Sequence, residues 1–163
     1  MISDPTAKVT ALAELLSRKG YSLSLAESCT GGLISSIITN IPGASAFFAG
    51  CAVTYSYESK EELLDVSHET LMGNGAVSEE TVKEMVSGAL ALFNTDIAGA
   101  VTGVAGPNGG TPLKPVGTVF IAVTDGKTTE CRRLSLKGSR DEIRNSASEE
   151  LIDMLTEFIG AES

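Results

Sequence analysis

Tryptophan is missing from this sequence, and His68 is its only histidine. One histidine cannot build a multi-histidine metal site, and a catalytic serine or cysteine would find no other imidazole to use as a base. The surrounding Ser-His-Glu-Thr is typical of a helix start, so we expect His68 to be solvated. Because no carboxylate cluster has the spacing of metal ligands either, we expect no metal and no cofactor.

Cysteine is also scarce. The three residues of this type, Cys29, Cys51 and Cys131, are odd in number and far apart, as is usual where thiols stay reduced. Long apolar runs are missing, and residues 1–5 lack the basic and apolar segments of a signal peptide. We therefore expect a soluble, unprocessed cytoplasmic protein that does not contact a membrane.

Positive charge is in short supply: 12 Lys and Arg residues face 21 Asp and Glu residues, which gives a formal net charge of −9. Such a protein repels a phosphate backbone, so nucleic acid is not expected as a partner, and any anionic ligand must be held by local donors. With 163 residues, of which 42% are hydrophobic, the chain is long enough to bury its own core. We expect one compact domain over residues 1–163.

Apolar spacing along the chain alternates between the patterns of helices and of buried strands. Helices are predicted at 5–19, 33–38, 58–65, 67–75, 78–93 and 139–158, and strands at 23–26, 47–55, 96–101, 116–124 and 128–136. Asp125-Gly126 is a hairpin signal, so the last two strands should pair antiparallel. Interleaved strands and helices that end on a hairpin and a helix predict an α/β fold, a single three-layer α/β/α sandwich with a mixed sheet.

The turn Ser28-Cys29-Thr30-Gly31-Gly32 lies between a predicted strand and a predicted helix. The first N–H groups of a helix have no partner inside it, and glycine lets a ligand approach the backbone, so this turn could hold an anion or a developing oxyanion. Ser28, Cys29 and Thr30 are also three possible nucleophiles. The alternative is that Ser28 or Thr30 only caps the helix.

A second glycine-rich segment, 102–110, follows another predicted strand. In an open α/β sheet, ligands bind outside the carboxyl ends of the strands, so this loop and the first turn could line one crevice. The alternative is that the segment is a flexible connector.

A serine nucleophile needs a base, and lysine is the next candidate after histidine. Lys60 follows the strand-end residue Tyr55 by five positions. A lysine desolvated near a sheet edge could act as a neutral base, with Tyr55 relaying or orienting the proton. The alternative is that Lys60, which lies in Glu-Ser-Lys-Glu-Glu, is a solvated surface residue. Cys29 is a rival nucleophile, because a helix N-terminus would lower the pKa of its thiol.

Arg140 stands at a predicted helix start. The helix dipole disfavours a cation there, so its position could serve a ligand anion rather than the helix. The alternative is an exposed arginine without a role.

Five blocks of the sequence together resemble the CinA C-terminal domain family. They are 26–32, 53–56 with Lys60, 75–78, 103–107 with 114–118, and Arg140. The resemblance covers nearly the whole chain, and the family includes nicotinamide-nucleotide amidases. It implies a hydrolase of a linear carboxamide that needs no metal and converts nicotinamide mononucleotide to nicotinic acid mononucleotide and ammonia, as part of pyridine nucleotide recycling.

The resemblance also implies roles for single residues. The nucleophile of the family falls on Ser28, with Lys60 and Tyr55 as its helpers. Contacts to the phosphate and ribose of the substrate would map to Thr30, Gly31, Gly32, Thr102, Gly103, Gly106 and Arg140. The family also favours a homo-oligomer, and a dimer in particular.

Two features depart from the family pattern. Tyr57 follows the Tyr-Ser pair where many members have a small or polar residue, and the loop 108–113 reads Asn-Gly-Gly-Thr-Pro-Leu. Both could alter the rim of the pocket. The competing hypothesis is a module of the same family that binds a nucleotide at the glycine turn and does not turn it over.

Overall fold

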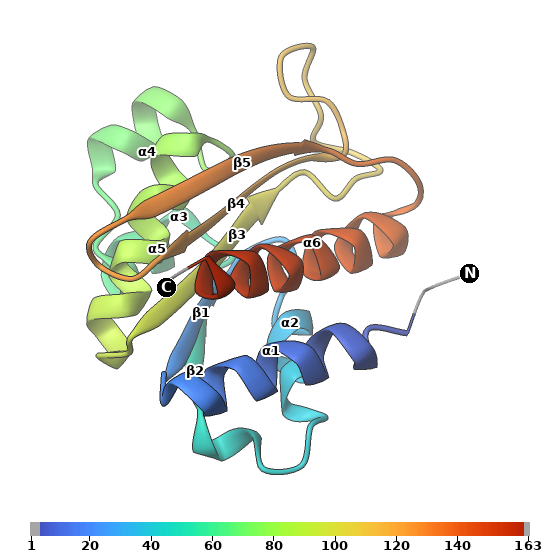
Figure 1. Cartoon of the computed structure of the whole chain (residues 1–163). Coiled ribbons are helices and arrows are strands. Elements are labelled where there is room, and N and C mark those ends of the chain that lie inside the picture. Colours follow the sequence, from blue (N-terminus) through green and yellow to red (C-terminus); the bar gives the residue numbers. More distant parts are fainter. Residues whose placement is uncertain (1–3, 162–163) are drawn as a thin grey trace.

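The fold is built on a five-stranded sheet, which we describe from a computed structural model that covers residues 4–161. The strand order is β2-β1-β3-β4-β5, with β1 at Leu23–Glu27, β2 at Phe48–Val53, β3 at Ile97–Gly103, β4 at Thr118–Thr124 and β5 at Thr129–Ser135. β1 is parallel to β2 and β3, whereas β4 is antiparallel to β3 and β5 (Figure 1). The sheet is therefore mixed, as predicted.

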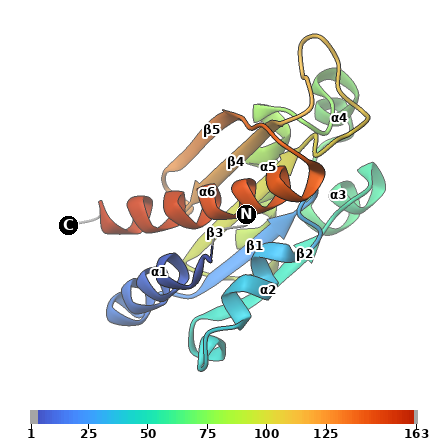
Figure 2. The same ribbon diagram turned by 90° about the vertical axis from the view of Figure 1, so that its right-hand side faces the viewer.

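Helices cover both faces of the sheet. On one face lie α1 (Thr6–Lys19), α2 (Leu33–Thr39) and α6 (Arg140–Gly160), and on the other lie α3 (Tyr57–Leu64), α4 (His68–Asn74) and α5 (Glu79–Phe93) (Figure 1, Figure 2). Each face has its own apolar core, one around Leu12, Ile34 and Leu151 and one around Leu64, Met85 and Val86. The three-layer α/β/α sandwich is confirmed.

Local sequence explains most of these elements. Every residue of β1 and β4 is buried, because both strands lie inside the sheet and are covered on two sides. The edge strand β5 instead carries exposed charged side chains, which protect a free edge from pairing with other chains. Ser78 caps α5 by accepting from the N–H of Thr81 at 3.1 Å, and the buried side chains of that helix recur at helical spacing.

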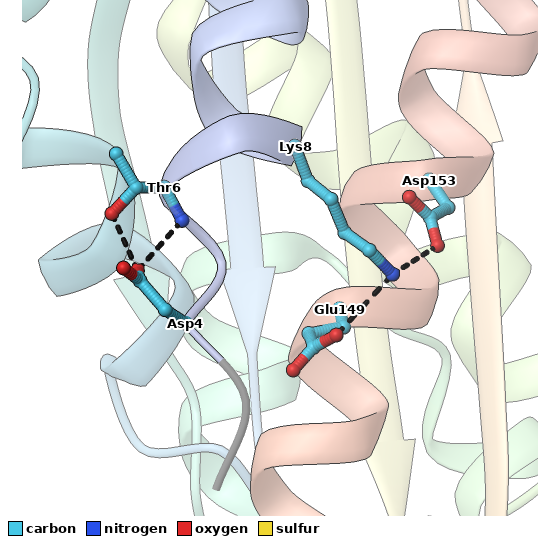
Figure 3. Close-up of polar contacts among 5 residues, drawn as sticks. All are labelled: Asp4, Thr6, Lys8, Glu149 and Asp153. Carbon is cyan, nitrogen blue, oxygen red and sulfur yellow. Dashed lines mark hydrogen bonds and ion pairs between the residues drawn. The ribbon is translucent and has the colours of Figure 1, made fainter.

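The start of α1 differs from the prediction. Pro5 is the N-cap rather than the first helical residue, and Asp4 accepts from the backbone N–H of Thr6 at 3.0 Å. One turn later, Lys8 pairs with two carboxylates of α6, Glu149 at 3.2 Å and Asp153 at 2.7 Å (Figure 3). These ion pairs tie the first helix to the last. In the part of the chain that the structure describes, we find no helix with the length and apolar character of a membrane span.

The carboxyl ends of β1, β2 and β3 lie side by side, and this arrangement positions the site. In the register of the sheet, Glu27 pairs with Val53 on one side and with Val101 on the other. The residues that follow these strand ends therefore meet at one edge of the sheet.

Candidate active site

Ser28 follows β1 directly and is held at the sheet edge by its own backbone, which donates to the carbonyl of Val101 at 3.1 Å. The Nζ of Lys60, from the second turn of α3, lies 2.9 Å from the Oγ of Ser28. Residues 32 positions apart thus form a buried hydroxyl and amine pair. This is the geometry that a serine nucleophile and a lysine base require.

Lys60 is 1% exposed, so the alternative of a solvated lysine is wrong. Its second contact is to the carbonyl oxygen of Thr54 at 2.5 Å. Burial disfavours the ammonium form and lowers the pKa of Lys60 to about 8. A large fraction of the amine is therefore neutral at mildly alkaline pH and able to accept a proton.

The packing of α3 brings Lys60 to this place. Ser56 caps the helix in a reciprocal pair with Ser59, which fixes where the first turn begins. Farther along, α3 lies against Gly88 of α5 so closely that a Cβ at this position would overlap the carbonyl oxygen of Leu64. Gly88 thus lets the two helix backbones touch, and α3 can direct Lys60 inward.

Cys29 does not fit the role of a rival nucleophile. Its side chain is buried, and burial raises the pKa of the thiol to about 11, against the lowering expected at a helix N-terminus. The loss of solvation outweighs the favourable charges of Arg144 and Lys60 nearby. The reactive thiolate is therefore the minor form at neutral pH.

The turn at residues 30–32 already holds an anion, and this anion is the carboxylate of Glu27. Its Oε1 accepts from the hydroxyl of Thr30 at 2.6 Å and from the N–H of Gly32 at 3.2 Å. The N–H of Gly31 donates to the carbonyl of Ser28 at 3.0 Å. Glu27 and Ser28 thus occupy the donors of Thr30, Gly31 and Gly32, and the contact of these three residues with a substrate stays a prediction.

A cavity of about 300 Å³ opens beside Ser28 and Lys60. Its lining comes from the first turn, the end of β2, the segment before α5, the glycine-rich loop and α6, and consists of Ser28, Cys29, Tyr55, Lys60, Ala76, Val77, Thr102, Gly103, Val104, Ala105, Gly106, Asn108, Gly109 and Arg140. Besides Ser28, six residues that were predicted to be catalytic or to bind substrate therefore line this cavity: Tyr55, Lys60, Thr102, Gly103, Gly106 and Arg140.

Tyr55 and Arg140 lie together at the mouth of this cavity. The guanidinium of Arg140 donates to the carbonyl of Gly106 at 2.6 Å and to the hydroxyl of Tyr55 at 3.1 Å. Tyr55 is 64% exposed and shares no hydrogen bond with Ser28 or Lys60. The structure thus groups Tyr55 with Arg140, whereas the sequence grouped it with Lys60.

Two walls of the cavity are backbone segments held by side chains. The hydroxyl of Thr102 donates to the carbonyl of Ala76 at 2.8 Å, and the hydroxyl of Tyr57 accepts from the N–H of the same residue at 3.3 Å. Tyr57 therefore supports the lining residue Ala76 without lining the cavity itself. The glycine-rich loop after β3 is anchored by Lys114, whose Nζ donates to the carbonyl of Asn74 at 2.8 Å.

Sequence reasoning missed Glu27 and Arg144. The Nε of Arg144 donates to the carbonyl of Cys29 at 3.2 Å, and its Nη2 donates to the carbonyl of Thr30 at 2.9 Å. Glu27 ends a strand whose residues are all buried, and a charged residue there is a signal that the pattern of buried strands does not explain. Arg144 carries no comparable signal, because it falls on the polar side of a long helix.

Two other features lie outside this site. The side chain of His68 is 72% exposed, in agreement with its predicted solvation, and its Nδ1 lies 2.6 Å from the Oε1 of Glu61. A wider groove of about 590 Å³ runs between α3 and α5 past Leu63, Leu92 and Gly88. Ser28 and Lys60 are not among its lining residues and border the smaller cavity instead.

Known proteins resemble this sequence over most of its length. Residues 6–159 match the model of the CinA C-terminal domain. CinA-like proteins of Endomicrobium trichonymphae and Fervidobacterium nodosum are each 50% identical, over 86% and 87% of this chain, respectively. The chain spans about a third of the length of these relatives, at 33% and 35%.

Solved structures agree over nearly the full chain. The competence damage-inducible protein A of Klebsiella pneumoniae superposes with a TM-score of 0.95 at 36% identity, covering 99% of this chain and 100% of that one. The competence/damage inducible protein of Agrobacterium tumefaciens gives a TM-score of 0.93, also at 36% identity, covering 97% and 96%. The chain belongs to the CinA C-terminal domain family.

Proposed function

We propose that this protein is an amidohydrolase that releases ammonia from the carboxamide of nicotinamide mononucleotide and leaves nicotinic acid mononucleotide. The observation that carries the proposal is the 2.9 Å contact between the Nζ of Lys60 and the Oγ of Ser28, beside a cavity and away from bulk water. The family resemblance supplies the substrate, and the pair supplies the reaction class.

The two residues can carry both halves of a double displacement. Neutral Lys60 takes the proton of Ser28 as Oγ attacks the carboxamide carbon, and the resulting ammonium returns that proton to the leaving nitrogen, which departs as ammonia. Water then attacks the acyl-serine ester, with Lys60 as the base, and regenerates Ser28 and the acid. A pKa of about 8 suits both steps, because neither form of the amine is rare near neutral pH.

The oxyanion needs donors other than those predicted at Gly31 and Gly32, whose N–H groups are already used. The backbone N–H of Cys29, the residue after the nucleophile, is our candidate, because Cys29 lines the cavity. The small apolar residues Ala76, Val77 and Val104 would border a flat ring. Arg140 is the permanently charged residue of the lining and would pair with the phosphate.

Ammonia release from nicotinamide mononucleotide is the direct test. The wild-type protein should release ammonia, Ser28→Ala should abolish release without lowering the melting temperature, and Cys29→Ala should be much milder. Release by Ser28→Ala at the wild-type rate would remove Ser28 from the nucleophile role. Binding of the nucleotide by the wild-type protein without release would leave a non-catalytic binding module instead.

A further inference from the structure

Two groups of opposite charge, one fully buried and one partly buried, hold the turn that carries Ser28, and neither lines the cavity. On one side is the carboxylate of Glu27, which is fully buried. On the other is the guanidinium of Arg144, which reaches the turn from α6. The reaction proposed at Ser28 does not require either side chain to touch a substrate. Their position beside the turn therefore indicates another role.

Glu27 takes up the donors of the turn and of the helix that follows. Its Oε1 also accepts from the N–H of Ile34 at 3.0 Å, and its Oε2 accepts from the N–H of Ser35 at 3.0 Å and from the hydroxyl of the same residue at 2.6 Å. The thiol of Cys51, on the edge strand β2, adds a contact at 3.4 Å. The first turn of α2 is thus capped by the residue directly before the nucleophile.

Arg144 takes up the acceptors. Its planar guanidinium bridges two successive carbonyls, those of Cys29 and Thr30, with two different nitrogens. The carbonyl of Cys29 and the N–H of Thr30 belong to one rigid peptide plane, so the bond to Arg144 fixes the orientation of both groups. A lysine could not reproduce this arrangement, because its charge sits at a single atom.

We propose that Glu27 and Arg144 are positioning residues for Ser28: together they clamp residues 28–35 from two sides and hold Oγ at the distance from Lys60 that proton transfer requires. The inference rests on the proposed function for its kinetic consequences. Its structural content is that two charged side chains that do not line the cavity hold the backbone around Ser28. Misplacement of a reacting atom by about 1 Å is enough to cost about 100-fold in rate.

Arg144 offers the cleaner test, because it is only partly buried and its loss leaves no unpaired charge in the core. We expect Arg144→Ala to lower kcat by roughly 10- to 100-fold while KM changes less than about threefold. Arg144→Lys should lie between wild type and Arg144→Ala. The pH at which activity rises should stay where it is in wild type, because burial lowers the pKa of Lys60 and the substitution leaves this burial unchanged.

A second readout does not depend on the substrate. A fluorophosphonate reacts covalently with an activated serine, so its rate of attachment to Ser28 reports the nucleophile alone. We expect this rate to fall in Arg144→Ala by the same factor as kcat, and to recover in part when guanidinium ion is added at millimolar concentration. Glu27→Gln, which turns one acceptor oxygen into a donor facing N–H groups, should lower both the labelling rate and the melting temperature.

Arg132→Ala is the matched control. Arg132 pairs with Glu157 of α6 at 2.7 Å, so this substitution also removes a bond between an arginine and α6, but one far from Ser28 in the sequence. It should label at the wild-type rate. The proposal would be overturned if Arg144→Ala were labelled at the wild-type rate, or if Arg132→Ala lost as much labelling rate as Arg144→Ala. It would also be overturned if the wild-type protein were not labelled at Ser28. If Arg144→Ala fails to fold, Arg144→Lys decides. Wild-type labelling without ammonia release would reject the proposed function alone.

Discussion

Two glycine-containing segments border the cavity, and they are held in different ways. The turn at 28–35 is held from inside, by the buried carboxylate of Glu27 and by Arg144. The loop at 104–117 is tied to its surroundings by long side chains: Arg140 donates to the carbonyl of Gly106, Arg133 donates to that of Leu113, and Lys114 of the loop donates to that of Asn74. Leu113, at the loop tip, is 84% exposed.

This difference separates chemistry from recognition. Buried charges fix atoms to a fraction of an ångström and cost much to move, which suits a nucleophile. Exposed hydrogen bonds are weak and exchange readily with water, which suits a rim that must admit and release a ligand. Changes at the first segment should therefore act on kcat, and changes at the second should act on KM.

The largest effect is expected from Lys60→Met, which keeps the length of the side chain but removes the amine. Activity should fall by 10²- to 10⁴-fold, the usual contribution of a general base. The melting temperature should stay unchanged or rise, because the variant no longer buries an amine whose charged form is disfavoured. Ammonia release and thermal unfolding measured on one preparation test both; a variant that keeps its activity would contradict the assignment of the base.

The same lysine should set the pH dependence. Because the pKa of Lys60 is lowered to about 8, kcat/KM should rise with pH and level off above that value. Stability should follow the same direction: between pH 8 and 10.5 the unfolded chain binds more protons at this residue than the folded one, so its contribution to stability increases as pH rises. His68→Ala is the control. A profile that follows a group near 6.5 and disappears in this variant would rule out Lys60.

Arg140→Ala tests the border between the two regions. If Arg140 pairs with the phosphate, its loss should cost about 1.5 to 3 kcal/mol of binding free energy for the mononucleotide, the strength of charge-assisted hydrogen bonds. The value of kcat/KM should fall by the corresponding factor, chiefly through a higher KM. The riboside, which lacks the phosphate, should change little. Because Arg140 also bonds Gly106 and Tyr55, Tyr55→Phe is the control: it removes the bond to Tyr55 and keeps the charge of Arg140 and its bond to the loop. An unchanged ratio between the two substrates would show that Arg140 does not read the phosphate.

The fold could be predicted because its elements are encoded locally. The apolar stripe at 79–93, the buried run at 97–103 and the hairpin signal at 125–126 each specify one element within a short window. The burial of Lys60 could not be predicted in this way. Its neighbours in sequence are polar, and only the close approach of α3 to Gly88 of α5 turns the side chain inward.

The turn at 28–35 shows a second limit of local reasoning. The pattern of small and hydroxyl residues after a strand indicated free donors for a ligand anion, but it did not show that a side chain of the protein takes up these donors. Glu27, one residue before the motif, is that side chain. The pKa of Cys29 was misjudged for the same reason, since burial under α6 is a tertiary effect and outweighs the position of the thiol near a helix start.

The smallest effect should come from Lys114→Ala, which removes one exposed hydrogen bond between the loop and the wall at Asn74. A bond of this kind contributes about 0.5–1.5 kcal/mol, part of which water replaces, so KM should rise roughly two- to fivefold. The value of kcat and the labelling of Ser28 should not change, because no contact of the turn at 28–35 is lost. If Lys114→Ala instead lowered kcat as Arg144→Ala does, the loop would share in fixing the nucleophile, and the division between a rigid turn and an adjustable rim would be wrong.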